Sequence, residues 1–202
     1  MFYRKEAYGT VTEDLFSFVR KTKVFVSVIK AKDDSFSPVV ELSEKWITWK
    51  CIKDLKTCMR CLEDDGKILP ADTEPYHIRC RCEKGEVWSV VAGNATKEGQ
   101  NGADYWLKHY GVLPDYYISE DDIKALGWTP KESPIKYAPD KMMTRGTYLN
   151  DDKKLPNTPG RVWYEADINY YFGKRNGHRV VWSNDGLIFV TYDHYNSFME
   201  II

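Results

Sequence analysis

The sequence predicts an α+β fold, in which helices precede an antiparallel sheet and a small Cys/His-rich module comes before both. Two observations in the C-terminal half support this class. Apolar residues recur at helical spacing between residues 103 and 127, and short runs of alternating or β-branched residues fill residues 162–191. A third observation, five cysteines between residues 51 and 82, sets the N-terminal part apart.

Helices and an early strand can be expected from local patterns. Residues 15–19 follow a capping sequence and predict a short helix, and residues 24–29 (VFVSVI) predict a buried strand. Residues 103–110 (ADYWLKHY) place apolar side chains at helical spacing, and the glycine that follows suits a helix C-terminus. Ser119 opens a capping box of the S-x-x-D kind, and its helix should end at Gly127.

Three neighbouring antiparallel strands are expected in the C-terminal third of the chain. Residues 162–168 alternate apolar and polar side chains, so Glu165 and Asp167 point to the same face. Two further runs lie on either side of Asn-Asp-Gly at residues 184–186, a sequence that tolerates the positive φ of a tight hairpin turn. One face of the first strand is therefore core, and the other is available for chemistry.

Such a sheet brings four functional side chains to one rim. Glu165 lies on the first strand, Arg179 at the start of the second and His194 just after the third, while Arg175 comes from a glycine-rich loop. A carboxylate can take a proton from a hydroxyl, an imidazolium can give one to a leaving oxygen, and arginines neutralise charge on phosphate oxygens. Each residue alone would more often be structural. Together they predict RNA cleavage through the 2′-hydroxyl of RNA itself, with no cofactor for catalysis.

The region from about residue 101 to residue 202 resembles barnase and the bacterial guanyl-preferring ribonucleases related to it. The matching sequences are LPDYYIS, ALGW, KKLP, GRVWYEADINY, GKRNGHR and DHY. The resemblance covers about half of the chain and implies helices packed on a twisted antiparallel sheet. It also implies that Glu165 is the general base, that His194 is the general acid, and that Arg175 and Arg179 hold the phosphate.

The resemblance further implies four substrate-binding residues. Asp167 bridges the two arginines, and Tyr195 lies beside the base site. Residues 142–156 form a first strand and a guanine-reading loop, which contains Asn150 and Asp152. In the family, a glutamate in this loop pairs with the guanine edge. Asp152 has the same carboxylate on a side chain that is one methylene shorter.

Two charges depart from the family pattern. Glu120 stands where the family has an active-site lysine, and Asp151 replaces an arginine beside the guanine-binding glutamate. Each exchange turns a positive charge into a negative one. The expected consequence is a weaker hold on phosphate.

The cysteines predict a structural metal site. Cys58 and Cys61 form a C-x-x-C pair, and a second pair, Cys80 and Cys82, follows after a loop. These four sulfurs could bind zinc, with His77 as an alternative ligand to one of them; disulfides or free thiols are the alternative.

The sequences WKCIKDLKTCMRC and PYHIRCRC, within residues 46–83, also resemble the Cys/His motif of phage minor head proteins, which precedes toxin domains in polymorphic toxins. Residues 93–102 are rich in Gly, Asn and Thr and predict a linker. The expected division is therefore a Cys/His-rich module at 1–92, a linker at 93–102 and a barnase-like domain at 103–202.

Composition limits the remaining functions. The chain has 202 residues, 43% of them hydrophobic, and a net charge of −1, so it is globular. No apolar run is long enough for a membrane span, and the first residues lack the pattern of a signal peptide, which predicts a cytoplasmic protein or a toxin exported by a non-standard route. Without a strong net positive charge, RNA must be attracted locally.

Three functions compete at this point. The first is a toxin-like endoribonuclease that cleaves single-stranded RNA to a 2′,3′-cyclic phosphate, with a preference for guanosine. The second is a zinc-stabilised interaction or structural module of phage origin whose ribonuclease half is weak or inactive. The third is a nuclease fold that serves mainly to bind a barstar-like inhibitor. Glu120 and Asp151 favour the second, whereas the complete set of Glu165, Arg175, Arg179 and His194 favours the first.

Overall fold

The computed structural model describes residues 27–28, 36 and 38–202. The helix expected at residues 15–19 lies outside the described residues, and of the strand expected at 24–29 only Ser27–Val28 is described, as β1. In the described part of the chain, no helix has the length and apolar character needed to cross a membrane.

The helices and strands alternate irregularly along the chain. Their bounds are β2 Val39–Lys50, α2 Met59–Glu63, β3 Ile68–Pro70, β4 Glu83–Val90, α3 Ala103–Tyr110, β5 Tyr117–Ser119, α4 Glu120–Ala125, β6 Met142–Tyr148, β7 Trp163–Asp167, β8 Arg179–Ser183, β9 Ile188–Thr191 and β10 Met199–Ile201.

The local predictions for the C-terminal half are confirmed. Helix α3 ends at Gly111, which takes the left-handed φ of 73° expected of a C-terminal glycine. Helix α4 is capped by the hydroxyl of Ser119, which accepts a hydrogen bond from the backbone N–H of Asp122. Strands β7, β8 and β9 pair antiparallel as expected, and Gly186 in the hairpin turn has a φ of 93°.

One sheet runs through the molecule, and it is mixed rather than antiparallel. Its strand order is β1-β2-β4-β10-β9-β8-β7-β6-β5, with β3 also paired to β2. Strand β4 pairs parallel with β10, and β5 pairs parallel with β6. The predicted antiparallel pairing holds from β6 to β10 but was wrong for the sheet as a whole. Both parallel partners are brought together by long connections that leave no local pattern.

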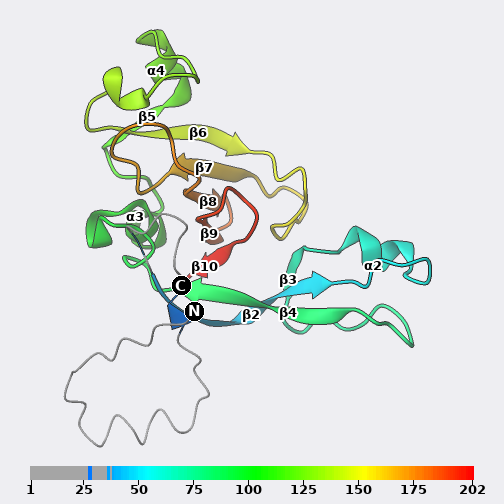
Figure 1. Cartoon of the computed structure of the whole chain (residues 1–202). Coiled ribbons are helices and arrows are strands. Elements are labelled where there is room, and N and C mark those ends of the chain that lie inside the picture. The colour runs from blue at the N-terminus through cyan, green and yellow to red at the C-terminus, as the bar shows by residue number, and fades with distance from the viewer. Residues whose placement is uncertain (1–26, 29–35, 37) are drawn as a thin grey trace, which may run out of the picture.

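Strands β2 and β4 reach away from the rest of the sheet as a long arm, with α2 near its far end (Figure 1). We call residues 39–90 the arm. Its inner part is packed against the C-terminal half, because Ile68 and Val87 share a core with Leu155, Phe189 and Phe198. The division into domains at residues 1–92 and 103–202 therefore remains a prediction about folding units.

The segment at 93–102 is packed rather than a loose linker. The buried carboxylate of Asp104 accepts hydrogen bonds from the backbone N–H groups of Gly93 (2.7 Å) and Ala95 (2.8 Å) and from the hydroxyl of Thr96 (2.7 Å). A Cβ on Gly102 would lie 1.8 Å from Thr96 Oγ1. Small residues are needed here because the chain winds closely around a carboxylate, and this need produces the same composition as a linker.

Candidate active site

Two carboxylates of β7 are buried side by side on one face of the sheet. Glu165 is 3% exposed and Asp167 is 1% exposed. The two residues are two positions apart on a strand, so their side chains point the same way. In the register of β7 with β8, Asp167 lies opposite Arg179. Glu165 and Asp167 therefore share one face of the strand, as the alternating sequence predicts.

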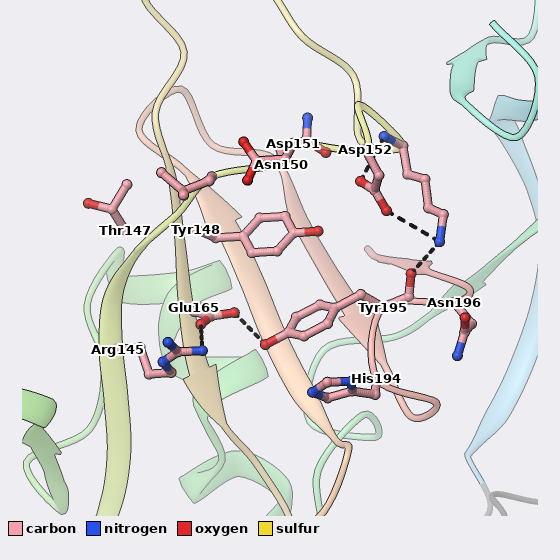
Figure 2. A pocket seen from close by; sticks show the side chains of 12 residues that line it. Arg145, Thr147, Tyr148, Asn150, Asp151, Asp152, Glu165, His194, Tyr195 and Asn196 are labelled. Carbon is pink, nitrogen blue, oxygen red and sulfur yellow. Dashed lines mark hydrogen bonds and ion pairs between the residues drawn. The ribbon is translucent and has the colours of Figure 1, made fainter. Parts of the chain in front are cut away.

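Glu165 lines a recess of about 480 Å³ (Figure 2). The same recess is lined by Arg145, Tyr148, Asp152, His194 and Tyr195. The structure thus brings the predicted base, the predicted acid and part of the predicted base-reading loop to one cavity. The rings of Tyr148 and Tyr195 stack with centroids 5.2 Å apart. Flat aromatic surfaces of this kind suit the stacking of an unpaired base.

Tyr195 is held against the predicted base. Its hydroxyl donates a hydrogen bond of 2.5 Å to Glu165 Oε2. Burial, together with this contact to Glu165, raises the pKa of Tyr195 well above its usual value. The tyrosine therefore stays protonated and fixes the orientation of the carboxylate.

The loop that carries the predicted acid has an unusual backbone. His194 and Tyr195 take φ values of 57° and 65°, a left-handed conformation that is costly for residues other than glycine. Asp193 stabilises the loop by accepting hydrogen bonds from the hydroxyl of Thr191 (2.9 Å) and the N–H of Ser197 (2.9 Å). The backbone N–H of His194 donates to the carbonyl of Gly177. Such a fixed and strained conformation is common where side chains must be aimed at a substrate.

The two predicted phosphate-binding arginines share one carboxylate. Arg175 donates two hydrogen bonds of 2.7 Å to Asp167, and Arg179 Nε lies 3.0 Å from Asp167 Oδ1. Burial alone would lower the pKa of Arg175, but the hydrogen bonds and charge of Asp167 outweigh it and raise the pKa. With Lys131, Lys174 and His194, both arginines line a second recess of about 740 Å³. His194 lines both recesses, so it lies between the recess of Glu165 and the recess of the two arginines.

The arginines differ in how freely they can meet a substrate. Arg179 is only 4% exposed, and its Nη1 donates to the backbone carbonyls of Asn176 (2.8 Å) and His178 (2.6 Å). Arg175 has about a fifth of its side chain exposed. Arg175 is therefore the better placed of the two to touch phosphate, and Arg179 holds Asp167 in position.

The predicted guanine-reading loop is shaped from within. The side chain of Asn150 donates to the carbonyl of Leu155 (3.0 Å) and accepts from its N–H (3.1 Å), so this amide serves the loop itself. Asp152 lies at the mouth of the recess, with Oδ2 3.3 Å from Lys154 Nζ. The arm contributes to the same loop, because the N–H of Ile68 donates to the carbonyl of Lys154 (2.7 Å).

The sequence reasoning missed Arg145, which lies beside Glu165 in the recess (Figure 2). It also treated Glu120 as an unpaired negative charge. In the structure, Glu120 forms ion pairs of 2.9 Å with both Lys124 and Arg145, so its charge is compensated. The available signal was the glycine after Arg145, because a glycine inside a strand pattern often marks a bulge.

The cysteines and His77 gather at the far end of the arm. Cys58, Cys61 and His77 have ligand atoms within 4.8 Å of one another, and so do Cys61, Cys80 and Cys82. Cys61 Sγ lies 3.8 Å from Cys80 Sγ and 3.5 Å from His77 Nε2. Two sulfurs bound to one tetrahedral zinc lie about 3.8 Å apart, and a sulfur and a ring nitrogen about 3.6 Å apart. The donor set therefore fits zinc.

Comparisons with known proteins match the half of the chain that contains the recesses. The family model of the ribonucleases matches residues 99–202. Three relatives named ribonuclease, from Heyndrickxia coagulans, Bacillus intermedius and Bacillus pumilus, are each 43% identical to this chain over 100 residues, or 49% of its length. Those residues cover 91% of the first relative and 61% of the other two. The resemblance of residues 46–83 to phage head proteins lies outside the matched region and stays a prediction.

Proposed function

Since the chain belongs to the ribonuclease family and is a ribonuclease enzyme, we propose that it cleaves single-stranded RNA by transesterification to a 2′,3′-cyclic phosphate. The observation that carries this proposal is the shared recess in which Glu165 and His194 meet, with Asp167 and its two arginines next to it. The alternative of an inactive scaffold is less favoured, because the charge of Glu120 is compensated by two cations.

In the first half of the reaction, Glu165 accepts the proton of the 2′-hydroxyl. The 2′-oxygen then attacks the adjacent phosphorus. Tyr195 holds one carboxylate oxygen through its hydrogen bond, and the other, Oε1, which lies 3.4 Å from Arg145 Nη1, takes the proton. Arg175, on the neighbouring recess, neutralises negative charge that builds up on the phosphorus oxygens.

In the second half, His194 gives a proton to the departing 5′-oxygen. This role requires the imidazole to face the side of the phosphate opposite Glu165. His194 lines both recesses, and this position between the base side and the arginine side supports the assignment. After the 5′-product leaves, His194 takes a proton from water and the water oxygen attacks phosphorus. The bond from phosphorus to the 2′-oxygen breaks as Glu165 returns its proton to that oxygen, which leaves a 3′-phosphate.

We expect purified protein to cleave a fluorogenic single-stranded RNA, with the rate maintained after divalent ions are removed by EDTA. The reason is that the four side chains supply both proton transfers and the charge on phosphate. A thermal unfolding curve of the chelated protein controls for loss of the fold. If folded, chelated protein no longer cleaves and added Mg²⁺ restores the rate, the proposed acid-base chemistry is wrong.

A preference for guanosine is part of the same proposal. Asp152 offers a carboxylate to a guanine in the recess. The same carboxylate is paired with Lys154, so Lys154 and the guanine would share it. Sequencing of the cleavage ends should show an excess of cuts after guanosine, and Asp152→Glu should sharpen that excess. Cuts spread equally over all four nucleotides would reject a base-reading role for this loop.

We also propose that the arm binds one zinc ion, which stabilises the fold without taking part in cleavage. Two groups of donors share Cys61, one with Cys58 and His77 and the other with Cys80 and Cys82. Cys58, Cys61 and His77 would then supply three ligands, and Cys80 or Cys82 the fourth. The sulfurs of Cys51 and Cys82 lie 2.9 Å apart, closer than two ligands of one zinc, so Cys51 and Cys82 do not both bind the ion. His77 would then take the place that the sequence pattern gives to one cysteine of the Cys80 and Cys82 pair.

Elemental analysis should find about one zinc per chain. His77→Ala should lower the zinc content, whereas Cys51→Ser, at the same end of the arm, should keep it. Loss of zinc should also lower the unfolding temperature, because structural zinc contributes folding free energy. Zinc retained by His77→Ala but lost by Cys82→Ser would return the ligand set to four cysteines.

A toxin role and a barstar-like acidic inhibitor remain proposals from the family resemblance. Lys131 and Lys174 at the arginine side would suit an acidic partner. Inhibition of RNA cleavage by a barstar-like protein, weakened by Lys174→Glu, would support the second of these proposals. Unchanged cleavage at a large excess of such a protein would reject it.

A further inference from the structure

Strand β6 carries one extra residue opposite the predicted base. In its pairing with β7, Thr144 lies opposite Ala166 and Gly146 lies opposite Glu165, so Arg145 has no partner on β7. Gly146 takes a φ of +74°, a backbone conformation that other residues adopt at a cost. A bulge of this kind re-aims a side chain. Here it directs Arg145 into the recess, next to Glu165 (Figure 2).

Arg145 is anchored at one edge of its guanidinium and faces the predicted base with the other. Its Nε donates a hydrogen bond of 2.9 Å to Glu120 Oε2, and its Nη1 lies 3.4 Å from Glu165 Oε1. Burial alone would raise the pKa of Glu120, but the hydrogen bonds from Lys124 and Arg145 outweigh it and lower the pKa. Glu120, the first residue of α4, is thus a charged and fixed partner for Arg145.

Three other cations around the two recesses are paired with carboxylates other than Glu165. Arg175 and Arg179 are both paired with Asp167, and Lys154 is paired with Asp152. Arg145 shares its anchor with Lys124, and 48% of its side chain is exposed. Among the ion pairs of the described residues, Arg145 is the cation that contacts Glu165 directly.

We propose that Arg145 is a catalytic residue, whose guanidinium binds a non-bridging oxygen of the scissile phosphate as Glu165 takes the proton of the 2′-hydroxyl. This inference rests on the proposed function of the site and adds a residue to it. Glu120 acts through Arg145 and is a positioning residue.

The charges in the reaction explain why Arg145 acts during the chemical step. A bond forms between the 2′-oxygen and phosphorus while the proton moves to Glu165, and the bond from phosphorus to the 5′-oxygen breaks as His194 gives that oxygen its proton. Glu165 becomes neutral at the moment when negative charge builds up on the phosphorus oxygens. The attraction between Arg145 and Glu165 is then lost, and the guanidinium meets the new charge while Nε stays on Glu120. An interaction that strengthens only in the transition state raises kcat rather than lowering KM.

The test compares Arg145→Met, Arg145→Lys and the control Lys141→Met in steady-state cleavage of one short RNA. Lys141 lies just before the same strand, and its ammonium donates to the backbone carbonyl of Asp115, outside both recesses. Arg145→Met should lower kcat by about 10²-fold, as removal of a transition-state donor does, while KM changes by less than about threefold. Arg145→Lys should recover part of the loss, and Lys141→Met should behave like the wild type.

A second variant separates chemistry from folding. Adding Glu120→Lys to Arg145→Met places an ammonium at the position of the anchor and should restore part of kcat, although the original ion pair is gone. Arg145→Gln keeps a donor toward Glu120 and gives the same comparison if methionine disturbs the strand, as judged by the unfolding temperature. If the wild type cleaves RNA and Arg145→Met or Arg145→Gln has the kcat of the wild type, the role of Arg145 is wrong while the proposed function stands. A loss that neither lysine variant reduces assigns Arg145 to structure, and a wild type that does not cleave RNA overturns the proposed function together with this inference.

Discussion

His194→Ala is expected to lower kcat/KM for RNA by about 10³-fold, within the range for removal of a general acid. The 5′-oxygen of RNA departs poorly as an alkoxide, so the reaction depends on a proton delivered to it. The backbone of the loop should persist in this variant, because Asp193 and Thr191 hold it through hydrogen bonds that do not involve the imidazole. The measurement is steady-state cleavage of a short RNA.

The leaving group provides the diagnostic comparison for His194. A substrate in which an aryl group replaces the 5′-nucleoside departs without a proton, so His194→Ala should lose far less on this substrate. Glu165→Ala should lose activity on both substrates, because the 2′-hydroxyl needs its base in each. His109→Ala, an exposed histidine on α3, is the matched control. Equal losses of His194→Ala on the two substrates would contradict its role as the acid.

Asp167→Ala is expected to destabilise the protein by about 3–5 kcal/mol, the range for removing one partner of a buried ion pair. Asp167 is 1% exposed and Arg179 is 4% exposed, so the variant leaves a buried guanidinium without its anion. Arg175, which donates both of its short hydrogen bonds to Asp167, loses its partner as well. Urea unfolding of wild type and variant gives the difference in free energy.

An ion pair with both partners exposed is the control for Asp167. Asp54 pairs with Arg81 at 2.6 Å, and both side chains are 40% exposed. Water can replace such a partner, so Asp54→Ala should leave the free energy of unfolding close to that of the wild type. If the two alanine variants lose similar stability, the cluster around Asp167 does not depend on burial as described here.

Much of the local structure could be predicted from short-range patterns. Helix α3 and its glycine, the Ser119 cap and strands β7 to β9 depend on residues within a few positions of one another, so the sequence contains their signals. The meeting of Glu165 with His194 in one recess follows from the same strand order.

The remaining features depend on contacts between distant segments. Arg145 enters the site only because β6 has an extra residue relative to β7, and the charge of Glu120 is compensated by that same residue from another element. The parallel pairing of β4 with β10 joins segments that are separated by about half of the chain. The loop around Asp104 has the composition of a linker, because both need small and polar residues.

The central claim is metal-free transesterification with Glu165 as base and His194 as acid. The most direct test is phosphorus NMR of a short RNA during cleavage by the wild-type protein, with no divalent ions added. The account predicts a 2′,3′-cyclic phosphate that appears first and converts slowly to a 3′-phosphate. Products that carry 3′-hydroxyl and 5′-phosphate ends would contradict it, because they require water, and not the 2′-hydroxyl, as the attacking group.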